Sequence, residues 1–315
     1  MILLTGATGF IGRALVDYLS QKSISLVAAV RRSEDRLPED VKKVCVGDLS
    51  TKTDFREALR GVETVVHLAA RVHVMNETLE DPLAAYRQTN VEGTLNLARQ
   101  AAMAGVQRFV FVSSIKVNGE STAPGLPFSP ESHPEPLDPY GVSKWEAEQE
   151  LFKMASQFPK GIVILRLPLV YGPGVKANFF KLMTVVAKGW PLPFGAIRNR
   201  RSMIGQRNLV DLIWTCIEHP RAKNQTFLAT DGPALSTTKL LQSLAVAFKK
   251  RSFLIPIPQS WMEFALKRLG KEDFAMRLCG NLEIDGRKNQ DCLNWQAPYS
   301  FEDEIKNTVE WYQSL

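Results

Sequence analysis

Cysteine and histidine are scarce in this chain, with four of each among 315 residues. No two cysteines form a CxxC pair, and none is grouped with histidines at the spacing of metal ligands. The scarcity argues against a zinc site and a disulfide framework and favours a reducing compartment, so we predict a cytoplasmic protein without a bound metal. Apolar runs of about 18 residues are also missing, so we expect no membrane span.

Charge of one sign is likewise limited. The chain has 39 Lys+Arg against 33 Asp+Glu, a formal net charge of +6, and the basic residues are spread along it. This mild excess is too diffuse to indicate nucleic-acid binding. With 45% hydrophobic and 23% charged residues, the composition is that of a globular protein of roughly two domains.

Short apolar runs alternate with helical patterns through the first half. We predict strands at residues 2–5, 25–30, 44–46, 64–68, 109–113 and 161–167, and helices at 12–22, 52–60, 90–104 and 140–157. The strands are apolar on both faces, as in a parallel sheet covered by helices on two sides. The pattern therefore predicts an α/β fold with a Rossmann-like, doubly wound parallel sheet.

Two stretches interrupt this alternation. Residues 119–139 are rich in proline and predict a long surface loop. After about residue 171, glycine and proline separate shorter helices at 236–249, 259–270 and 301–313, whereas a helix at 208–219 returns to the sheet. We therefore predict a dinucleotide-binding domain at 1–170 plus about 205–230, and a smaller mixed α/β substrate domain at 171–204 and 231–315. We expect Trp190, Trp261, Trp295 and Trp311 to pack in the smaller domain.

A glycine-rich loop follows the first predicted strand. Residues 5–12 read TGATGFIG and lead directly into a helical pattern. Glycines at such a turn let the backbone approach a pyrophosphate, which then lies on the helix N-terminus. The strand, loop and helix together predict a dinucleotide-binding site, although a glycine-rich turn without ligand is the alternative.

The end of the second predicted strand bears on the choice of dinucleotide. It carries Arg31 and Arg32, and Ser33, Glu34 and Asp35 come only afterwards. Basic residues at this position receive a 2′-phosphate, so we predict that NADP(H) is favoured over NAD(H). A solvated basic loop is the alternative.

Tyr140 and Lys144 lie four residues apart at the start of a predicted helix, on one helical face. A lysine cation beside the phenol favours phenolate, so we expect a lowered pKa for Tyr140 and a role in proton transfer. The spacing gains weight from Ser113 and Ser114 at the end of a preceding strand.

With these motifs the sequence resembles the extended short-chain dehydrogenase/reductases, and more narrowly their nucleotide-sugar epimerase/dehydratase branch. The motifs GDL at 47–49, HLAA at 67–70, TNVEGT at 89–94 and YGVSK at 140–144 belong to that pattern. RLPLVYGPG at 166–174, RSMI at 201–204 and CLNW at 292–295 continue it through the back half.

The resemblance implies roles for individual residues. The catalytic residues would be Ser114, Tyr140 and Lys144. The substrate would be contacted by Ser114, Lys116, Asn178 and Arg201. The dinucleotide would be held by Gly6, Gly9, Phe10, Ile11, Gly12, Asp48, Leu49, Leu68, Ala69, Ala70, Asn90, Ser113, Tyr140 and Lys144. Asn178 has an alternative role as N-cap of a helix beginning at Phe179, and Arg201 as one of several solvated arginines.

Departures from the branch pattern narrow the reaction. Ser114-Ile115-Lys116 stands where dehydratases of this branch carry Thr-Asp-Glu, which disfavours 4,6-dehydration. This segment is most similar to reductases of UDP-4-keto-6-deoxy-N-acetylhexosamines, so we predict reduction of the C4 ketone of such a UDP-sugar. The alternatives are a UDP-glucose or UDP-N-acetylglucosamine 4-epimerase and, outside enzymes, a dinucleotide-sensing scaffold.

The resemblance also implies a homodimer built by the helices predicted at 90–104 and 140–157. Small or apolar residues offer contacts on them, namely Ala101, Ala102, Ala104, Ala147, Leu151 and Met154.

Overall fold

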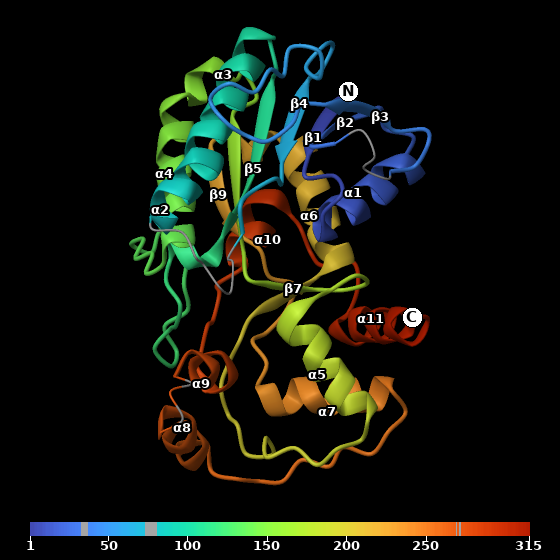
Figure 1. Cartoon of the computed structure of the whole chain (residues 1–315), viewed down its shortest axis with the longest axis vertical. Helices are drawn as coiled ribbons and strands as arrows, with labels where there is room; N and C mark the ends of the chain where they lie inside the picture. The colour runs from blue at the N-terminus through green and yellow to red at the C-terminus, as the bar shows by residue number, and fades with distance from the viewer. Residues whose placement is uncertain (33–36, 73–80, 269, 271) are drawn as a thin grey trace.

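The computed structural model describes residues 1–32, 37–72, 81–268, 270 and 272–315 and shows a sheet lobe above a smaller second lobe (Figure 1). Ser33, Glu34 and Asp35, which follow the second predicted strand, lie outside the described residues. Within those residues no helix is both long and apolar enough to cross a membrane.

The sheet lobe is built on seven parallel strands. Their spatial order is β3-β2-β1-β4-β5-β6-β9, and the direction of winding changes between β1 and β4. The strands are β1 (Ile2–Thr5), β2 (Leu26–Val30), β3 (Lys42–Cys45), β4 (Thr64–His67), β5 (Arg108–Ser114), β6 (Ile162–Leu167) and β9 (Gln225–Leu228). This confirms the doubly wound sheet, and such folds bind ligands outside the carboxyl ends of strands at the change of direction.

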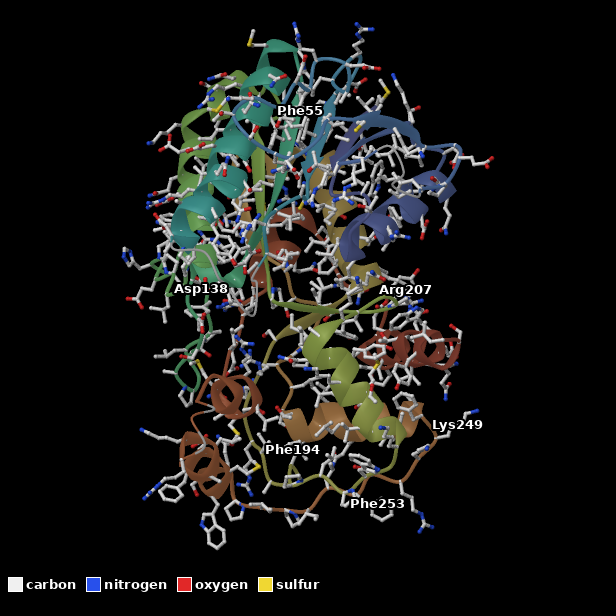
Figure 2. The ribbon with its side chains drawn as sticks, viewed as in Figure 1. Phe55, Asp138, Phe194, Arg207, Lys249 and Phe253 are labelled. Atoms are coloured by element: carbon white, nitrogen blue, oxygen red, sulfur yellow. The ribbon has the colours of Figure 1, made fainter. Side chains whose placement is uncertain are left out.

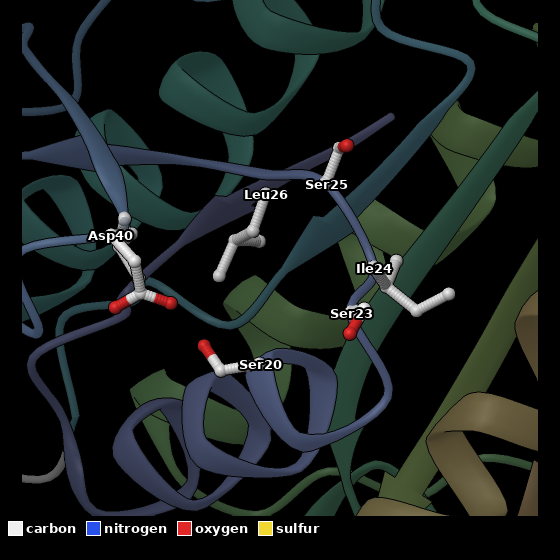
Figure 3. A pocket seen from close by; sticks show the side chains of 7 residues that line it. Ser20, Ser23, Ile24, Ser25, Leu26 and Asp40 are labelled. Atoms are coloured by element: carbon white, nitrogen blue, oxygen red, sulfur yellow. The ribbon is translucent and has the colours of Figure 1, made fainter.

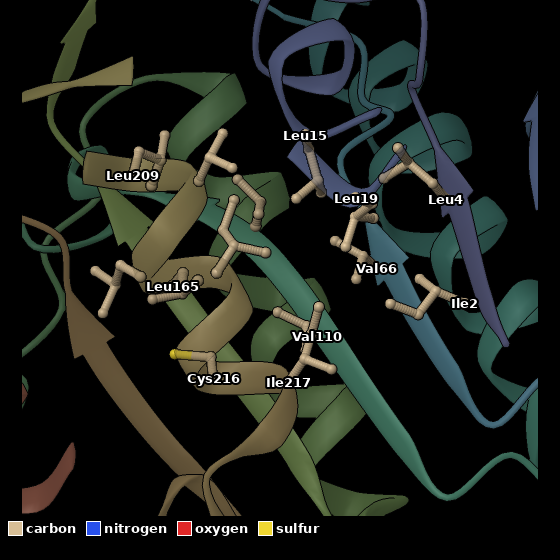
Figure 4. Packing of buried hydrophobic residues seen from close by; sticks show 14 of the residues in the cluster. Ile2, Leu4, Leu15, Leu19, Val66, Val110, Leu165, Leu209, Cys216 and Ile217 are labelled. Atoms are coloured by element: carbon tan, nitrogen blue, oxygen red, sulfur yellow. The ribbon is translucent and has the colours of Figure 1, made fainter. Parts of the chain in front are cut away.

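Helices cover both faces of the sheet (Figure 1). One face carries α1 (Phe10–Gln21) and α6 (Gln206–Glu218), and the other carries α2 (Pro82–Arg87), the π-helix η1 (Gln88–Gly93), α3 (Thr94–Met103) and α4 (Pro139–Lys153). In Figure 4, Leu15 and Leu19 of α1 lie against Leu4 and Val66 of the strands. Burial on both faces explains why the strands are apolar throughout.

Two predictions about the sheet lobe are wrong. Residues 52–60 form successive turns and no helix, because side chains of α3 bind their backbone: Asn96 donates to the carbonyl of Thr53, and Gln100 accepts from the N–H of Phe55 at 2.8 Å. The expected dimer contacts at Ala101, Ala147 and Leu151 are completely buried in the chain's own core. These side chains cannot form the contacts of a second copy.

The second lobe combines a small sheet with helices. Its elements are β7 (Leu169–Tyr171), which pairs in parallel with β8 (Met203–Gly205), and α5 (Ala177–Ala187), α7 (Thr237–Ala247), α8 (Gln259–Arg268), α9 (Glu272–Cys279) and α11 (Phe301–Gln313). In contrast, α10 (Arg287–Leu293) lies against β9 of the sheet lobe (Figure 1). Leu293 and Trp295 are exceptions to the predicted division, because both pack into the core of the sheet lobe. There the indole of Trp295 donates to Asp211 of α6 at 2.8 Å.

Candidate active site

The loop between β1 and α1 needs glycine at two positions. Gly6 has φ +74°, and a Cβ there would lie 2.8 Å from the backbone nitrogen of Ala69. A Cβ on Gly12 would lie 2.1 Å from the carbonyl oxygen of Gly6. The missing side chains therefore allow the loop to pack closely against both the end of β4 and the first turn of α1.

The N-terminus of α1 is suited to an anion. Gly9 is the N-cap and supplies no side-chain cap, and the first turn, which contains Phe10 and Ile11, has no acidic residue. Its N–H groups and the positive end of the helix dipole thus remain available to a pyrophosphate. The loop sits after β1, where the sheet changes direction, so these residues fit a bound dinucleotide.

The end of β4 is fixed to β1 through a buried histidine. The Thr5 hydroxyl lies 2.6 Å from Nδ1 of His67 and accepts from the Ala69 N–H at 3.2 Å, and the Thr94 hydroxyl lies 2.9 Å from Nε2. Burial, with the nearby Lys144 charge, lowers the pKa of His67 to about 3. His67 is therefore a neutral packing residue that positions the Leu68-Ala69-Ala70 segment.

Asn90 joins this segment to α4. Its amide oxygen accepts from the Arg71 N–H at 2.8 Å, and its amide nitrogen donates to the Arg71 carbonyl and to the Ser143 hydroxyl, both at 3.0 Å. Asn90 lies in the π-helix η1 and is buried. Because these contacts occupy the amide, the structure gives Asn90 a positioning role next to the predicted dinucleotide site.

The end of β2 carries an ion pair instead of a purely basic tip. Arg31 Nε lies 3.1 Å from a carboxylate oxygen of Asp48, and both side chains are largely exposed. The neighbouring Leu49 packs against Gly93, where a Cβ would come within 3.0 Å of the leucine Cβ. A 2′-phosphate bound by Arg31 would meet the negative charge of Asp48, which weakens the argument for NADP(H).

Ser114 and Tyr140 are brought together as predicted. Ser114 ends β5, and its hydroxyl accepts from the Lys116 N–H at 3.3 Å. Tyr140 lies in the first turn of α4, and a hydrogen bond joins its side chain to that of Ser114. The two hydroxyl groups therefore share one site at the carboxyl edge of the sheet.

The pKa of Tyr140 departs from the expected direction. Burial and the charge of Asp138 raise it to about 12, against the opposing effect of the hydrogen bond with Ser114. Lys144 is itself completely buried, and burial lowers its pKa to about 7. Its ammonium donates to the Val112 carbonyl at 2.8 Å and lies 4.3 Å from the centre of the Phe111 ring. The protonated phenol is consequently the stable form of Tyr140.

Glu148, one turn beyond Lys144 on α4, organises a buried polar network. Ser113 donates to its carboxylate at 2.5 Å, and Arg166 of β6 pairs with it at 2.6 Å. Arg166 also donates to the amide oxygen of Asn118 at 3.0 Å. Ser113 at the end of β5 is thereby connected to α4. The sequence predictions missed this connection, although an arginine inside an apolar strand demands a buried partner.

Lys116 is engaged by carboxylates of the protein itself. It pairs with Glu120 at 2.9 Å and with Asp138. Burial lowers the pKa of Lys116, but the two carboxylates outweigh it and raise the pKa above its ordinary value. Asp138 lies at the end of the sheet lobe that faces the second lobe (Figure 2) and caps α4 by accepting from the Gly141 N–H at 2.6 Å. Lys116 therefore helps to fix the start of α4. Its ammonium is paired with carboxylates of the protein, whereas the sequence predicted that it contacts the substrate.

The two predicted diphosphate residues lie in the second lobe. Asn178 is exposed in the first turn of α5, whose N-cap is Lys176, so the alternative reading of Asn178 as an N-cap is wrong. Arg201 is half-buried and donates to the Gly280 carbonyl at 3.2 Å. Burial and the charge of Arg277 lower its pKa. Among the described residues no carboxylate pairs with Arg201, whereas Arg200 and Arg207 each have one, so Arg201 suits an external anion.

Two cavities lie away from these residues. One, of about 210 Å³, is lined by Ser20, Ser25 and Asp40 near the amino end of β2 (Figure 3). The other, of about 640 Å³, lies between the turns at 51–59 and α3. Neither adjoins the carboxyl edge of the sheet where Ser114 and Tyr140 meet, so we assign the reaction to neither.

Comparisons with known proteins identify the family of this chain. The NAD dependent epimerase/dehydratase family matches residues 2–229. A UDP-glucose 4-epimerase of Vibrio cholerae is 46% identical over 311 residues, which cover 98% of this chain and 94% of that protein. An N-acetyl-alpha-D-glucosaminyl-diphospho-ditrans,octacis-undecaprenol 4-epimerase of Escherichia coli O157:H7 is 26% identical over 98% of this chain and 94% of its own.

Among solved structures, MoeE5 in complex with UDP-glucose and NAD has a TM-score of 0.77 and 26% identity, covering 99% of this chain and 98% of MoeE5. A UDP-glucose 4-epimerase of Thermotoga maritima shares the fold at a TM-score of 0.77 and 23% identity, covering 99% of this chain and 98% of that one. With a family match over most of its length and a relative 46% identical across 98% of it, the chain belongs to the NAD dependent epimerase/dehydratase family.

Proposed function

We propose that the protein is a nucleotide-sugar 4-epimerase that acts on a UDP-hexose and uses NAD as its dinucleotide. The observation that carries the proposal is the pairing of Tyr140 with Ser114 at the sheet edge, next to an uncapped helix N-terminus and its glycine loop. Support for epimerisation comes from the similarity to the Vibrio cholerae UDP-glucose 4-epimerase. The similarity to this relative therefore favours 4-epimerisation, which the sequence predicted as an alternative, over reduction of a C4 ketone.

The proposed chemistry divides between the dinucleotide and the chain. NAD supplies a hydride acceptor and donor at its nicotinamide. Tyr140 takes the proton of the sugar's C4 hydroxyl as C4 becomes a ketone. After the sugar has rotated and presents the other face of C4 to the dinucleotide, Tyr140 returns a proton to the same oxygen. Because the pKa of Tyr140 is raised to about 12, its protonated form suits the second half of this cycle.

Neighbouring side chains support that proton transfer. Ser114 holds the C4 oxygen next to the phenol and stabilises the charge that develops on it. Lys144 lies four residues further along the same helical face. In the half of the cycle in which Tyr140 removes the C4 hydroxyl proton, the positive charge of Lys144 would stabilise the phenolate. Arg201 and Asn178 would contact the diphosphate from the second lobe.

A second candidate is the predicted reduction of a UDP-4-keto-6-deoxy-N-acetylhexosamine with NADPH. It is favoured by Arg31 and Arg32 at the end of β2, since a reductase must exchange its dinucleotide and the phosphorylated form is the usual reductant. The scaffold alternative is disfavoured because a sensor has no use for the Ser114 and Tyr140 pair.

One experiment separates these functions. The purified protein is incubated with UDP-glucose and with UDP-N-acetylglucosamine without added dinucleotide, and the products are followed by NMR. An epimerase forms the 4-epimer catalytically with its retained NAD. In parallel, NADPH and a UDP-4-keto-6-deoxy sugar are supplied, and consumption of NADPH without any epimer in the first assay would identify a reductase. Tyr140→Phe serves as the inactive control, and no turnover in either assay would favour the scaffold.

We further propose a homodimer in a reducing cytosol. All four cysteines are free thiols, which fits that compartment. Since Ala101, Ala147 and Leu151 are buried, the contact would use outward residues of α3 and α4 such as Arg99, Met103 and Gln149. A monomeric mass by light scattering at micromolar concentration would contradict the dimer.

A further inference from the structure

Exposed aromatic side chains gather at one end of the second lobe. In the part of the chain that the structure describes, every exposed tryptophan and phenylalanine lies between Trp190 and Phe264. Trp261 is 71% exposed, Phe264 63%, Trp190 59% and Phe253 57%, and Ile255 beside them is 49% exposed. Trp190 and Trp261 were predicted to pack inside this lobe, and that prediction is wrong. A group of exposed aromatic side chains often marks a surface that binds another molecule.

The aromatic residues project from elements that are held in place. Leu192 donates to the carbonyl of Phe253, and Ile255 donates back to Leu192, both at 2.8 Å. This pairing turns Leu254 toward the lobe's core and leaves Phe253 and Ile255 outside. Their exposure is therefore a property of a paired segment.

Helix α8 is divided in the same way. Met262 and Leu266 pack inward, whereas Trp261 and Phe264 face out on the opposite side. Figures 1 and 2 place α8 and the segment around Phe253 at the end of the molecule farthest from the first strands of the sheet lobe. We call Trp190, Phe253, Ile255, Trp261 and Phe264 the aromatic end.

Basic residues border the aromatic end, two of them in contact with its rings. From residue 249 to 268, Lys249, Lys250, Arg251, Lys267 and Arg268 are basic and only Glu263 is acidic. Arg268 lies over the Phe264 ring at 5.2 Å, and Lys188 lies over the Trp190 ring at 5.0 Å. Aromatic rings bordered by lysine and arginine are typical of surfaces that enter the headgroup region of a bilayer.

We propose that the aromatic end binds peripherally to an anionic lipid bilayer, with its rings at headgroup level and its cations against the lipid phosphates. Charge complementarity selects this occupant: a two-fold contact with a second copy would set the same cations against each other, whereas anionic lipids neutralise them. Helix α8 packs on α9. The carbonyl of Gly280, directly after α9, accepts from Arg201, so the membrane-binding surface lies one helix away from the predicted diphosphate contact. The inference does not depend on which reaction the site performs.

The test is flotation of the full chain with vesicles of phosphatidylcholine, with and without phosphatidylglycerol. We expect binding to the anionic vesicles that falls as salt is raised, and little binding to the neutral ones. Lys267→Ala/Arg268→Ala and Trp261→Ala/Phe264→Ala should each lower the affinity on the order of tenfold or more.

Matched controls remove equally exposed side chains elsewhere. Leu126→Ala/Leu137→Ala and Lys153→Ala/Lys160→Ala should float as the unchanged protein does. All four replaced pairs are exposed, and a circular dichroism spectrum equal to that of the unchanged protein verifies folding of each variant. The proposal is overturned if anionic vesicles are not bound, or if the controls lose as much affinity as the aromatic-end variants. It is also overturned if Trp261→Ala/Phe264→Ala halves the mass in solution while vesicle binding is absent, which would assign the surface to a second copy.

Discussion

Glu148 and Arg166 form a buried ion pair, with 2.6 Å between a carboxylate oxygen and a guanidinium nitrogen, one helical turn beyond Lys144. The pair joins α4 to β6, and Ser113, which donates to Glu148, lies next to Ser114 on β5. Its arrangement therefore links the stability of the sheet lobe to the geometry of the site.

Loss of the Glu148 charge should be costly, because the arginine would remain buried without a counter-ion. We expect Glu148→Gln to lower the free energy of unfolding by about 3–5 kcal/mol in denaturant titrations. Glu146→Gln is the matched control, since Glu146 pairs with the half-exposed Arg87 and its loss should change stability far less. Equal effects of the two changes would contradict a special role for the buried pair.

Tyr140→Phe removes the proposed proton donor and keeps the ring. We expect single-turnover rates to fall by roughly 10²–10⁴-fold while dinucleotide binding stays within a few-fold. Tyr86→Phe is the control, because its ring lies edge-on to Tyr140 at 6.1 Å but it is not proposed to move a proton. Turnover near normal in Tyr140→Phe would place the acid elsewhere, with Lys116 the first residue to examine.

His67 should make the protein sensitive to acid. Its folded-state pKa is lowered from 6.5 to about 3, so below pH 6.5 the unfolded chain takes up a proton that the folded chain does not. The contribution of neutral His67 to the free energy of unfolding is therefore fully present above pH 6.5 and is lost progressively as the pH falls from 6.5 toward 3. Between pH 6.5 and 5 the loss should be about 2 kcal/mol more in the unchanged protein than in His67→Gln. His133→Gln, an exposed histidine, should behave as the unchanged protein does, and a similar slope in all three would refute the assignment.

Asp48 should influence the choice between NAD and NADP. Asp48→Asn removes the negative charge beside Arg31, so the ratio of NADP to NAD affinity should rise on the order of tenfold. Asp54→Asn, which breaks a similarly exposed pair with Arg56, is the control and should leave the ratio unchanged. The dinucleotide released on denaturation should be NAD, and NADP in its place would restore the role first predicted for Arg31 and Arg32.

Local features of the sequence determined the class of fold and the centre of the site. The apolar strands, the glycine loop and the four-residue spacing of Tyr140 and Lys144 are each encoded by neighbours along the chain, so periodicity and turn chemistry are sufficient to find them.

Tertiary structure decided the features that depend on distant partners. The segment 52–60 has a helical pattern, but its backbone is bound by Asn96 and Gln100 of α3 instead. Lys116, Arg31 and Glu148 have charges that the sequence shows plainly, yet their partners depend on packing. The pairing of β2 with β3 sets the partner of Arg31, and the packing of β5, β6 and α4 sets those of Lys116 and Glu148. Packing likewise buried Ala101 and exposed Trp261. The sequence shows whether a side chain is apolar or charged. Only the assembled fold determines whether that side chain is buried or exposed to solvent and which groups it contacts.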